Sequence, residues 1–254
     1  SPNRIKPLGV YTHLLCMNSK QEKTFANTGS IVAGLELQSG KVGNLTLCKT
    51  AVTHKLDCLK YCLRFTGMGL LPVVSKARLE RTKLLKSDRL RFLSLLFDDL
   101  LALQCEAKKQ GIPLAIRLNT FSDLSWLPVI KRFPDIQFFD YTKEKERYRR
   151  FLRGDLPSNY HLTFSASEID RDHTLKGYLN QGGTVAVVFK LWRDNGQLPK
   201  RYLGSPVIDG DTHDLRYTDP RGAIIGLRNK GKLSGKDTDF SRPVPILDRM
   251  GNRA

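Results

Sequence analysis

The second half of the chain alternates short apolar segments with helix-like segments, and this alternation limits the fold more than any other feature. Strands that are almost entirely apolar are predicted at residues 30–38, 114–118, 136–141, 160–164, 184–189 and 223–227. Such strands, separated by helices, are typical of a parallel sheet that is covered on both faces. Parallel neighbours need right-handed crossover connections. The sequence therefore predicts an α/β fold whose parallel sheet of about six strands forms a partial or complete (β/α) barrel.

Helices are predicted between these strands. The longest runs from about Pro72 to Lys109, where leucine and phenylalanine recur at spacings of three and four residues before Gly111 ends the pattern. Shorter helices are predicted at residues 124–133, 143–152 and 171–179. One helix between successive strands is the arrangement that a parallel sheet requires.

The chain around the sheet is expected to divide into distinct parts. Residues 1–29 are polar and rich in turn signals, so they predict an irregular N-terminal extension. Residues 30–232 are predicted to form the barrel-like domain, with a cysteine-containing loop at residues 43–69 and a basic tail at residues 233–254. Neither a membrane-spanning stretch nor a signal peptide is recognisable. We therefore expect a cytoplasmic protein that does not contact membranes.

The chain is strongly basic. Its 254 residues contain 42 Lys+Arg and 25 Asp+Glu, which gives a formal net charge of +17. A charge of this size attracts polyanions, so DNA or RNA is the expected partner, with no sequence preference implied. The alternative is a basic surface that is merely well solvated. The five cysteines are an odd number in a chain expected to be intracellular, which argues against a disulfide framework.

Polar side chains follow the predicted strands at the points where the strands end. Arg117, Asn119 and Asp123 lie around the end of the strand at 114–118, and Lys143 follows the next strand. The carboxyl ends of parallel strands meet at one edge of a sheet, where α/β proteins place their sites. These four residues are therefore predicted to be catalytic or ligand-binding. The alternative for Asp123 is the cap of a helix.

Three cysteines in the loop at 43–69 form a candidate metal site. Cys48, Cys58 and Cys62 have the spacing C-x9-C-x3-C. Three thiolates from one loop can hold a [4Fe–4S] cluster and leave one iron open. A zinc site would need a fourth ligand, which His54 within the same loop could supply. A third interpretation is that Cys58 and Cys62 are simply buried on one helix face.

A second candidate metal site lies between the last two predicted strands. Asp209, Asp211 and His213 form an Asp-x-Asp-x-His pattern in which carboxylate oxygens and an imidazole could bind a divalent cation. The same segment could instead be a polar turn. It could also form salt bridges with Arg216 and Arg221.

Seven segments of the chain resemble a bacteriophage protein family named after mycobacteriophage gene product eighty-eight. They are CLRFTGMG (62–69), KAR (76–78), IRLN (116–119) followed by SD (122–123), RFPDIQFFDYTK (132–143), NYHLTFS (159–165), GGTVAVVF (182–189) and VIDGDTHDLRYTDPRG (207–222). The resemblance covers roughly residues 45–235, with the segments in the same order. It implies a phage or prophage origin, and it implies no particular activity.

A more distant likeness is to radical S-adenosylmethionine enzymes, which are similar in placing their cluster cysteines after the first strand of a partial (β/α)6 barrel. Cys58 and Cys62 match the first two cysteines of the family's C-x3-C-x2-C motif. The third position is Phe65, so Cys48 would have to replace that cysteine. The exit of the second strand lacks the family's glycine-rich run. The likeness implies S-adenosylmethionine as a further candidate cofactor.

Together these patterns predict a phage-encoded iron–sulfur protein that binds nucleic acid or a nucleotide-like ligand, with radical chemistry as one version of its activity. Two alternatives remain open. The chain could be a non-enzymatic nucleic-acid-binding factor for phage replication or host takeover, in which the metal is structural. It could also be a metal-dependent nuclease that uses Asp209, Asp211 and His213.

Overall fold

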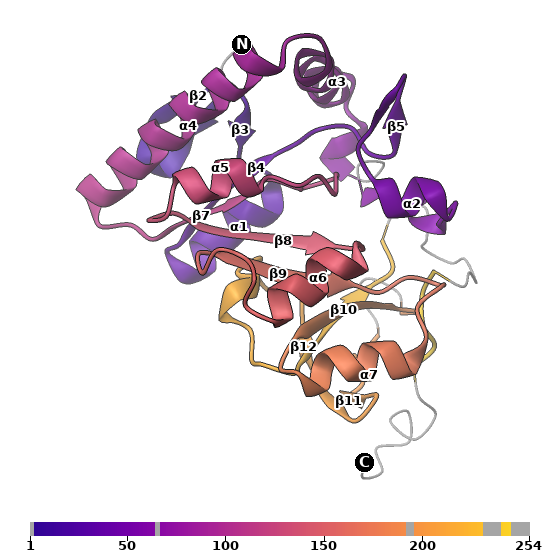
Figure 1. Ribbon diagram of the computed structural model, residues 1–254. Helices are drawn as coiled ribbons and strands as arrows, with labels where there is room; N and C mark the ends of the chain where they lie inside the picture. Colours follow the sequence, from indigo (N-terminus) through magenta and orange to yellow (C-terminus); the bar gives the residue numbers. More distant parts are fainter. Residues whose placement is uncertain (1–2, 64–66, 192–195, 231–239, 245–254) are drawn as a thin grey trace.

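The computed structural model describes residues 3–63, 67–191, 196–230 and 240–244 (Figure 1). The strands are β1 (Asn3–Ile5), β2 (Val10–Thr12), β3 (Leu15–Cys16), β4 (Ile31–Leu35), β5 (Lys41–Val42), β6 (Leu45–Thr46), β7 (Leu114–Arg117), β8 (Gln137–Thr142), β9 (Tyr160–Ser165), β10 (Thr184–Phe189), β11 (Arg201–Tyr202), β12 (Ser205–Asp209) and β13 (Ile224–Arg228). The helices are α1 (Ser19–Thr28), α2 (Lys49–Thr53), α3 (Pro72–Ser87), α4 (Arg89–Gln110), α5 (Leu127–Arg132), α6 (Lys145–Leu152) and α7 (Asp172–Asn180), and the 3₁₀ turns are η1 (Lys6–Leu8), η2 (Asp57–Leu59), η4 (Gly67–Leu70) and η5 (Arg216–Thr218).

The chain is α/β overall, but the predicted barrel is wrong. Within the described residues the main sheet has nine strands in the order β11-β12-β13-β10-β9-β8-β7-β4-β3. The strands from β12 to β4 run parallel to their neighbours, whereas β11 and β3 pair antiparallel at the two ends. The sheet is therefore mixed and larger than six strands, and its order ends at two edge strands instead of closing.

The long helix predicted from Pro72 to Lys109 is divided into α3 and α4 at Asp88. Pro72 occupies the first turn of α3, where its missing N–H costs no hydrogen bond. Asp88 ends α3 through its own N–H and then caps α4, because its carboxylate accepts from the N–H of Arg91 at 2.9 Å. None of the helices in the described ranges is apolar over enough length to cross a bilayer.

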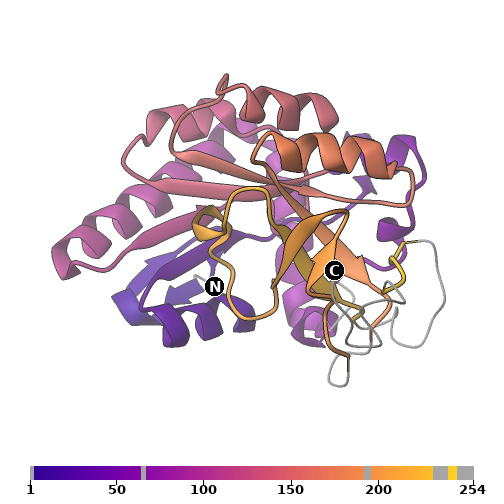
Figure 2. The same ribbon diagram turned by 90° about the horizontal axis from the view of Figure 1, so that it is seen from below.

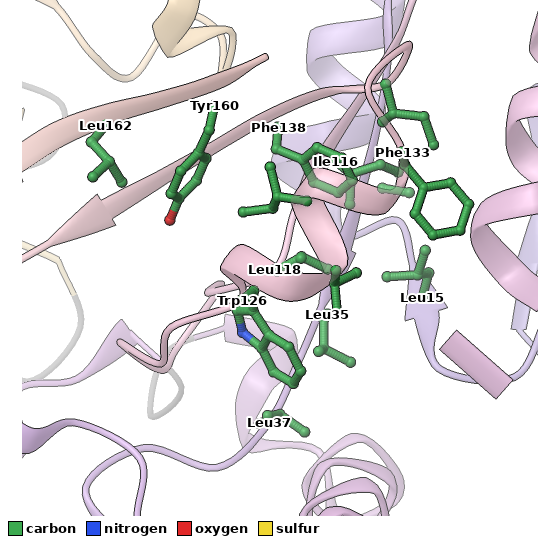
Figure 3. Packing of buried hydrophobic residues seen from close by; sticks show 14 of the residues in the cluster. Leu15, Leu35, Leu37, Ile116, Leu118, Trp126, Phe133, Phe138, Tyr160 and Leu162 are labelled. Carbon is green, nitrogen blue, oxygen red and sulfur yellow. The ribbon is translucent and has the colours of Figure 1, made fainter. Parts of the chain in front are cut away.

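One face of the sheet packs against helices α4, α5, α6 and α7 (Figures 1 and 2). Alternate residues of each strand point to this side, such as Ile116 of β7 and Phe138 of β8. They pack with Trp126 and with the leucines at the strand ends, as Figure 3 shows. Phe92 of α4 stacks on Trp126 with ring centroids 6.1 Å apart. This layer holds the exit of β7 rigidly in place.

The opposite face of the sheet is covered by α1 and by the connection between β12 and β13 (Figure 2). Leu215 of that connection packs on Val32, Ala115 and Phe139, which point away from the main helical layer. Tyr217 lies beside Phe139 with ring centroids 5.9 Å apart. The space that a barrel would enclose is therefore filled by a crossing segment of the chain.

The N-terminal part is regular rather than irregular as predicted. Asn18 caps α1 in a reciprocal arrangement with Gln21, and Gly29 ends the helix with a positive φ of 69°. The turn signals in the sequence are therefore the caps of a helix. The boundaries predicted at residues 29–30 and 232–233 stay predictions. Of the predicted tail at 233–254, only residues 240–244 are described.

Candidate functional site

A cavity of about 270 Å³ opens at the edge of the sheet where the parallel strands end. Its walls come from the exits of β7, β8, β9, β10 and β13, from the cysteine loop and from α1. Because the parallel strands of the described sheet all deliver their carboxyl ends to this edge, residues far apart in the chain meet around one space. Four predicted site residues line it together: Arg117, Asn119, Asp123 and Lys143.

The three candidate cysteines, Cys48, Cys58 and Cys62, line the same cavity. Cys48 precedes α2, and its sulfur accepts from the N–H of Gly40 at 3.3 Å and donates to the carbonyl of Phe121 at 3.5 Å. Burial raises the pKa of the Cys48 thiol to about 12 and that of Cys58 to about 11. Both sulfurs are therefore protonated at neutral pH in the absence of a bound metal.

No group of three or more histidine, cysteine, aspartate or glutamate side chains within the described ranges is arranged to hold a metal ion. The cysteines thus share a cavity without yet forming a coordination sphere. Cys58 lies in the short turn η2, and Cys62 lies just before the undescribed residues 64–66, which include Phe65. The other two cysteines lie elsewhere, since Cys16 is in β3 and Cys105 is exposed on α4.

Lys143 places a cation on the cavity wall next to Cys58. Its ammonium donates to the carbonyl and hydroxyl of Ser165, both at 3.0 Å, and to the carbonyl of Ala166 at 3.2 Å. Its Nζ atom also lies 5.8 Å from the ring centroid of Phe240. Burial raises the pKa of Cys58, and Lys143 is the largest influence that opposes this. A thiolate at Cys58 would therefore have a counterion at hand.

Asp123 holds the cavity wall together. Its carboxylate accepts from the Thr142 hydroxyl at 2.9 Å, the Lys143 N–H at 2.9 Å and the Arg147 guanidinium at 2.8 Å. Its own N–H donates to the carbonyl of Leu47 at 2.8 Å. Asp123 thus joins the exits of β7 and β8 to the cysteine loop, and its lone pairs are largely used by these contacts.

Asn119 is the hub of a buried network behind the cavity. Its side-chain oxygen accepts from the Ser122 hydroxyl, the Leu124 N–H and the Trp126 indole N–H, at 2.9, 2.9 and 3.3 Å. Its amide nitrogen and its backbone N–H both donate to the carboxylate of Asp140, at 3.1 and 2.7 Å. The sequence predicted a ligand-binding or catalytic Asn119, and the structure places it as the residue that shapes the exit of β7.

Asp140 should make stability depend on pH. Burial raises its pKa from the usual range to about 7, although bonds from Asn119 and Tyr160 oppose the shift. The unfolded chain releases this proton near pH 4 and the folded chain near pH 7, so the stabilisation is complete below pH 4 and lost as pH rises to 7. Compared with Asp140→Asn, the wild type should lose about 2–4 kcal/mol of unfolding free energy between pH 4 and pH 8. Urea titrations at several pH values measure this, and parallel curves for both proteins would contradict it.

Arg117 and Lys20 form what we call the floor of the cavity, and both contact Asp214, which lies outside the described lining. The carboxylate of Asp214 is 3.2 Å from the guanidinium of Arg117 and 3.2 Å from the ammonium of Lys20. Burial alone would raise the pKa of Asp214, but these two cations lower it to about 2. Arg117 also lies over the ring of Tyr141, with the guanidinium carbon 4.8 Å from the ring centroid.

The Asp-x-Asp-x-His segment lies beside the cavity, and its acidic groups are engaged by basic side chains. Arg228 contacts the carboxylates of Asp209 at 2.9 Å and Asp211 at 3.3 Å, and Lys230 also pairs with Asp211. His213 accepts from the N–H of Leu215 through Nδ1 at 3.2 Å. These contacts use the groups that a divalent cation would need. Arg216, which the sequence offered as a salt-bridge partner for this segment, pairs with Asp219 farther along it at 3.3 Å and donates to the carbonyl of His213 at 2.7 Å.

Several cavity residues gave no signal in the sequence. Lys20 belongs to a segment predicted to be irregular, and Arg228 and Lys230 follow the last strand. Tyr61 and Phe240 close one side of the cavity, with ring centroids 6.5 Å apart. Arg228 and Lys230 could have been found by applying the strand-exit rule to the last predicted strand. Nothing in the sequence brings Phe240 to the cysteine loop.

Comparison with protein-family models matches residues 13–243 of the chain to the family described as Gene product 88. The match includes every element that lines the cavity, from α1 to the segment around Phe240. No curated protein and no solved structure shows significant similarity to the chain.

Proposed function

The chain belongs to the bacteriophage Gene product 88 family, and from that premise we propose that it is a metalloprotein whose cavity holds an iron–sulfur cluster through Cys48, Cys58 and Cys62. The observation that carries this proposal is the shared cavity. Three of the five cysteines line one space at the strand exits, while the other two lie elsewhere. Packing cysteines have no reason to gather in this way at the edge where α/β proteins bind ligands.

The donor set favours an iron–sulfur cluster over zinc. Thiolates are the ligands that iron–sulfur clusters use, and three of them leave one iron free for a further ligand. A closed zinc site would need a fourth side chain. His54, the candidate from the sequence, is exposed and is absent from the described lining of the cavity, which contains no histidine.

One cation near the cysteines would partly offset the charge of a thiolate centre. Burial raises the pKa of Cys58 to about 11 and Lys143 opposes this shift only in part, so the metal itself would have to displace the thiol protons. The host cytoplasm, where we place this phage protein, keeps such thiols reduced. Folding around the centre would also add the binding free energy of the metal to the stability of the loop.

Within such a site the chain's own residues would position a ligand and exclude water. Most of the lining is apolar, with Phe121, Leu59 and Val188 among it. Arg117 and Lys143 supply charge at fixed points. When bound, an iron–sulfur cluster supplies electron transfer or an open coordination position. The geometry thus supports a redox or ligand-binding role at the mouth of the sheet.

Purification without oxygen tests this proposal. We expect brown protein that contains iron and acid-labile sulfide and absorbs visible light, and Cys58→Ser should lose most of the iron and colour because only two thiolates remain. Cys105→Ser is the matched control, since this cysteine is exposed on α4. It should retain the wild-type iron content. Colourless wild-type protein, or equal iron in both variants, would contradict the proposal; stoichiometric zinc without sulfide would show a structural site instead.

A further inference from the structure

The cavity floor carries more positive charge than its acidic partners balance. Lys20 and Arg117 are both within 3.2 Å of the single carboxylate of Asp214. Asp214 is buried and its low pKa keeps it ionised, so one negative charge faces two positive ones. Arg228 and Lys230, by contrast, are matched by Asp209 and Asp211. The positive charge that exceeds the paired carboxylates therefore lies at Arg117 and Lys20.

Lys143 adds a second excess charge across the cavity. Its three hydrogen bonds all go to neutral oxygens of Ser165 and Ala166. Among the described residues no carboxylate lies within ion-pair distance of it. Of the acids nearby, Asp123 pairs with Arg147, whereas Glu168 accepts from the neutral N–H of Asp57 at 2.5 Å and lies beyond ion-pair distance of Lys143.

Arg117, Tyr141 and Lys143 all line the cavity, from the exits of the neighbouring strands β7 and β8. The guanidinium of Arg117 rests on the Tyr141 ring, and Lys143 directly follows the end of β8 at Thr142. An anion in the cavity would therefore be flanked by two cations in a partly desolvated space, where charge-assisted contacts are strong.

The rest of the cavity limits what that anion can be attached to. Phe121, Tyr61 and Phe240 give it aromatic walls, and most of the lining is apolar. Aromatic walls favour a flat ring that can stack. A volume of about 270 Å³ is at the small end for ligand sites, so it admits one ring system with its charged group and no longer polymer.

We propose that this cavity binds a single nucleotide unit, with its phosphate between Arg117 and Lys143 and its base against the aromatic wall. The inference goes beyond the metal centre and does not require it. The unit can come from a free nucleotide or from the end of a strand. The exposed lysines Lys41, Lys55 and Lys60 line a second hollow that shares Ser39 and Leu59 with the cavity, so a longer strand would meet positive charge there.

Titration calorimetry of the full chain with adenosine 5′-monophosphate, adenosine and inorganic phosphate tests the proposal. The nucleotide should bind at least about tenfold more tightly than adenosine or phosphate alone, because only the nucleotide has both a phosphate for the two cations and a base for the aromatic wall. Lys143→Gln should weaken nucleotide binding about tenfold, and Lys143→Arg, which keeps the charge, should weaken it less than about threefold. Lys131→Gln removes an exposed lysine on α5 outside the cavity and should leave binding unchanged.

Two further experiments distinguish a free nucleotide from a strand end, and separate this proposal from that of the metal centre. A 5′-phosphorylated octadeoxyadenylate that binds more tightly than the mononucleotide identifies a strand end as the ligand, and the reverse order identifies a free nucleotide. Wild-type protein that has been stripped of metal with a chelator should still bind the nucleotide, and loss of nucleotide binding in this metal-free protein would overturn the inference. Adenosine binding as tightly as its monophosphate, or equal losses in Lys143→Gln and Lys131→Gln, would overturn the inference.

Discussion

Replacing Asp214 by asparagine should destabilise the protein by about 3–5 kcal/mol, because it removes the only carboxylate that is ion-paired with Lys20 and Arg117 in the described structure. The side chains of these two cations are 30% and 15% exposed, so water replaces little of the lost interaction. Breaking a buried pair from one side leaves uncompensated charge, which costs more than the pair contributed. Urea-induced unfolding at pH 7 measures the loss.

The pH dependence of this loss has a definite sign. The pKa of Asp214 is lowered to about 2, so its stabilisation is present above pH 4 and disappears as pH falls from 4 to 2. The gap between wild type and Asp214→Asn should therefore narrow in acid. Glu146→Gln is the control, because this exposed carboxylate pairs only at the surface and should cost less than about 1 kcal/mol. Equal effects of the two substitutions at pH 7 would show that the Asp214 contacts contribute little.

Replacing Asn119 by alanine should cost about 3–4 kcal/mol and disorder the exit of β7. The substitution removes the side-chain oxygen that accepts from Ser122, Leu124 and Trp126. It also removes the amide nitrogen that donates to the carbonyl of Leu124 and to the carboxylate of Asp140. Each buried polar group left without a partner costs roughly 1–3 kcal/mol, and the contacts are partly shared. Thermal unfolding and amide hydrogen exchange of residues 119–126 together measure the stability and the local order.

Ser122→Ala is the matched control for Asn119→Ala. It removes one donor from the same oxygen and leaves the other contacts of Asn119 in place. We expect a loss of about 1 kcal/mol, with exchange in the β7 exit close to that of the wild type. If Asn119→Ala destabilised the protein no more than Ser122→Ala, Asn119 would not be the hub of this network.

The sequence predicts the six central strands well because they carry the strongest signal that a chain can give. Segments such as 184–189 are almost entirely apolar and β-branched, and burial on both faces demands that composition. They correspond to β4, β7, β8, β9, β10 and β13. In the described residues α-helices connect these strands in turn from β4 to β10, whereas β10 reaches β13 through β11, β12 and η5.

The predicted barrel is wrong because the apolar patterns in the sequence do not indicate strand β12 or the segment that crosses the sheet after it. The strand β12 is only half-buried and contains Pro206, so it lacks the apolar run of a central strand, yet it pairs in parallel with β13. The connection after it packs Leu215 against the face of the sheet opposite helices α4, α5, α6 and α7. A polar segment rich in aspartate and glycine is typical of a surface turn, and tertiary contacts alone reveal that it crosses the sheet.

The meeting of polar side chains around one cavity is predictable, whereas the contacts that each side chain makes are not. Strand exits meet at one edge in any parallel sheet, so Arg117 and Lys143 lie around one cavity as the alternation implied. Asn119 and Asp123 follow the same rule, but their lone pairs are used by neighbouring donors. Whether a polar side chain faces a ligand or the protein depends on partners many residues away, such as Arg147 for Asp123.

X-ray absorption at the iron K-edge of oxygen-free protein tests the central claim most directly, because it identifies the atoms bound to the metal. We expect a near shell of sulfur with iron neighbours beyond it, and the loss of this signal in Cys58→Ser. A near shell of only nitrogen and oxygen, or no bound iron in the wild type, would contradict a cluster held by Cys48, Cys58 and Cys62.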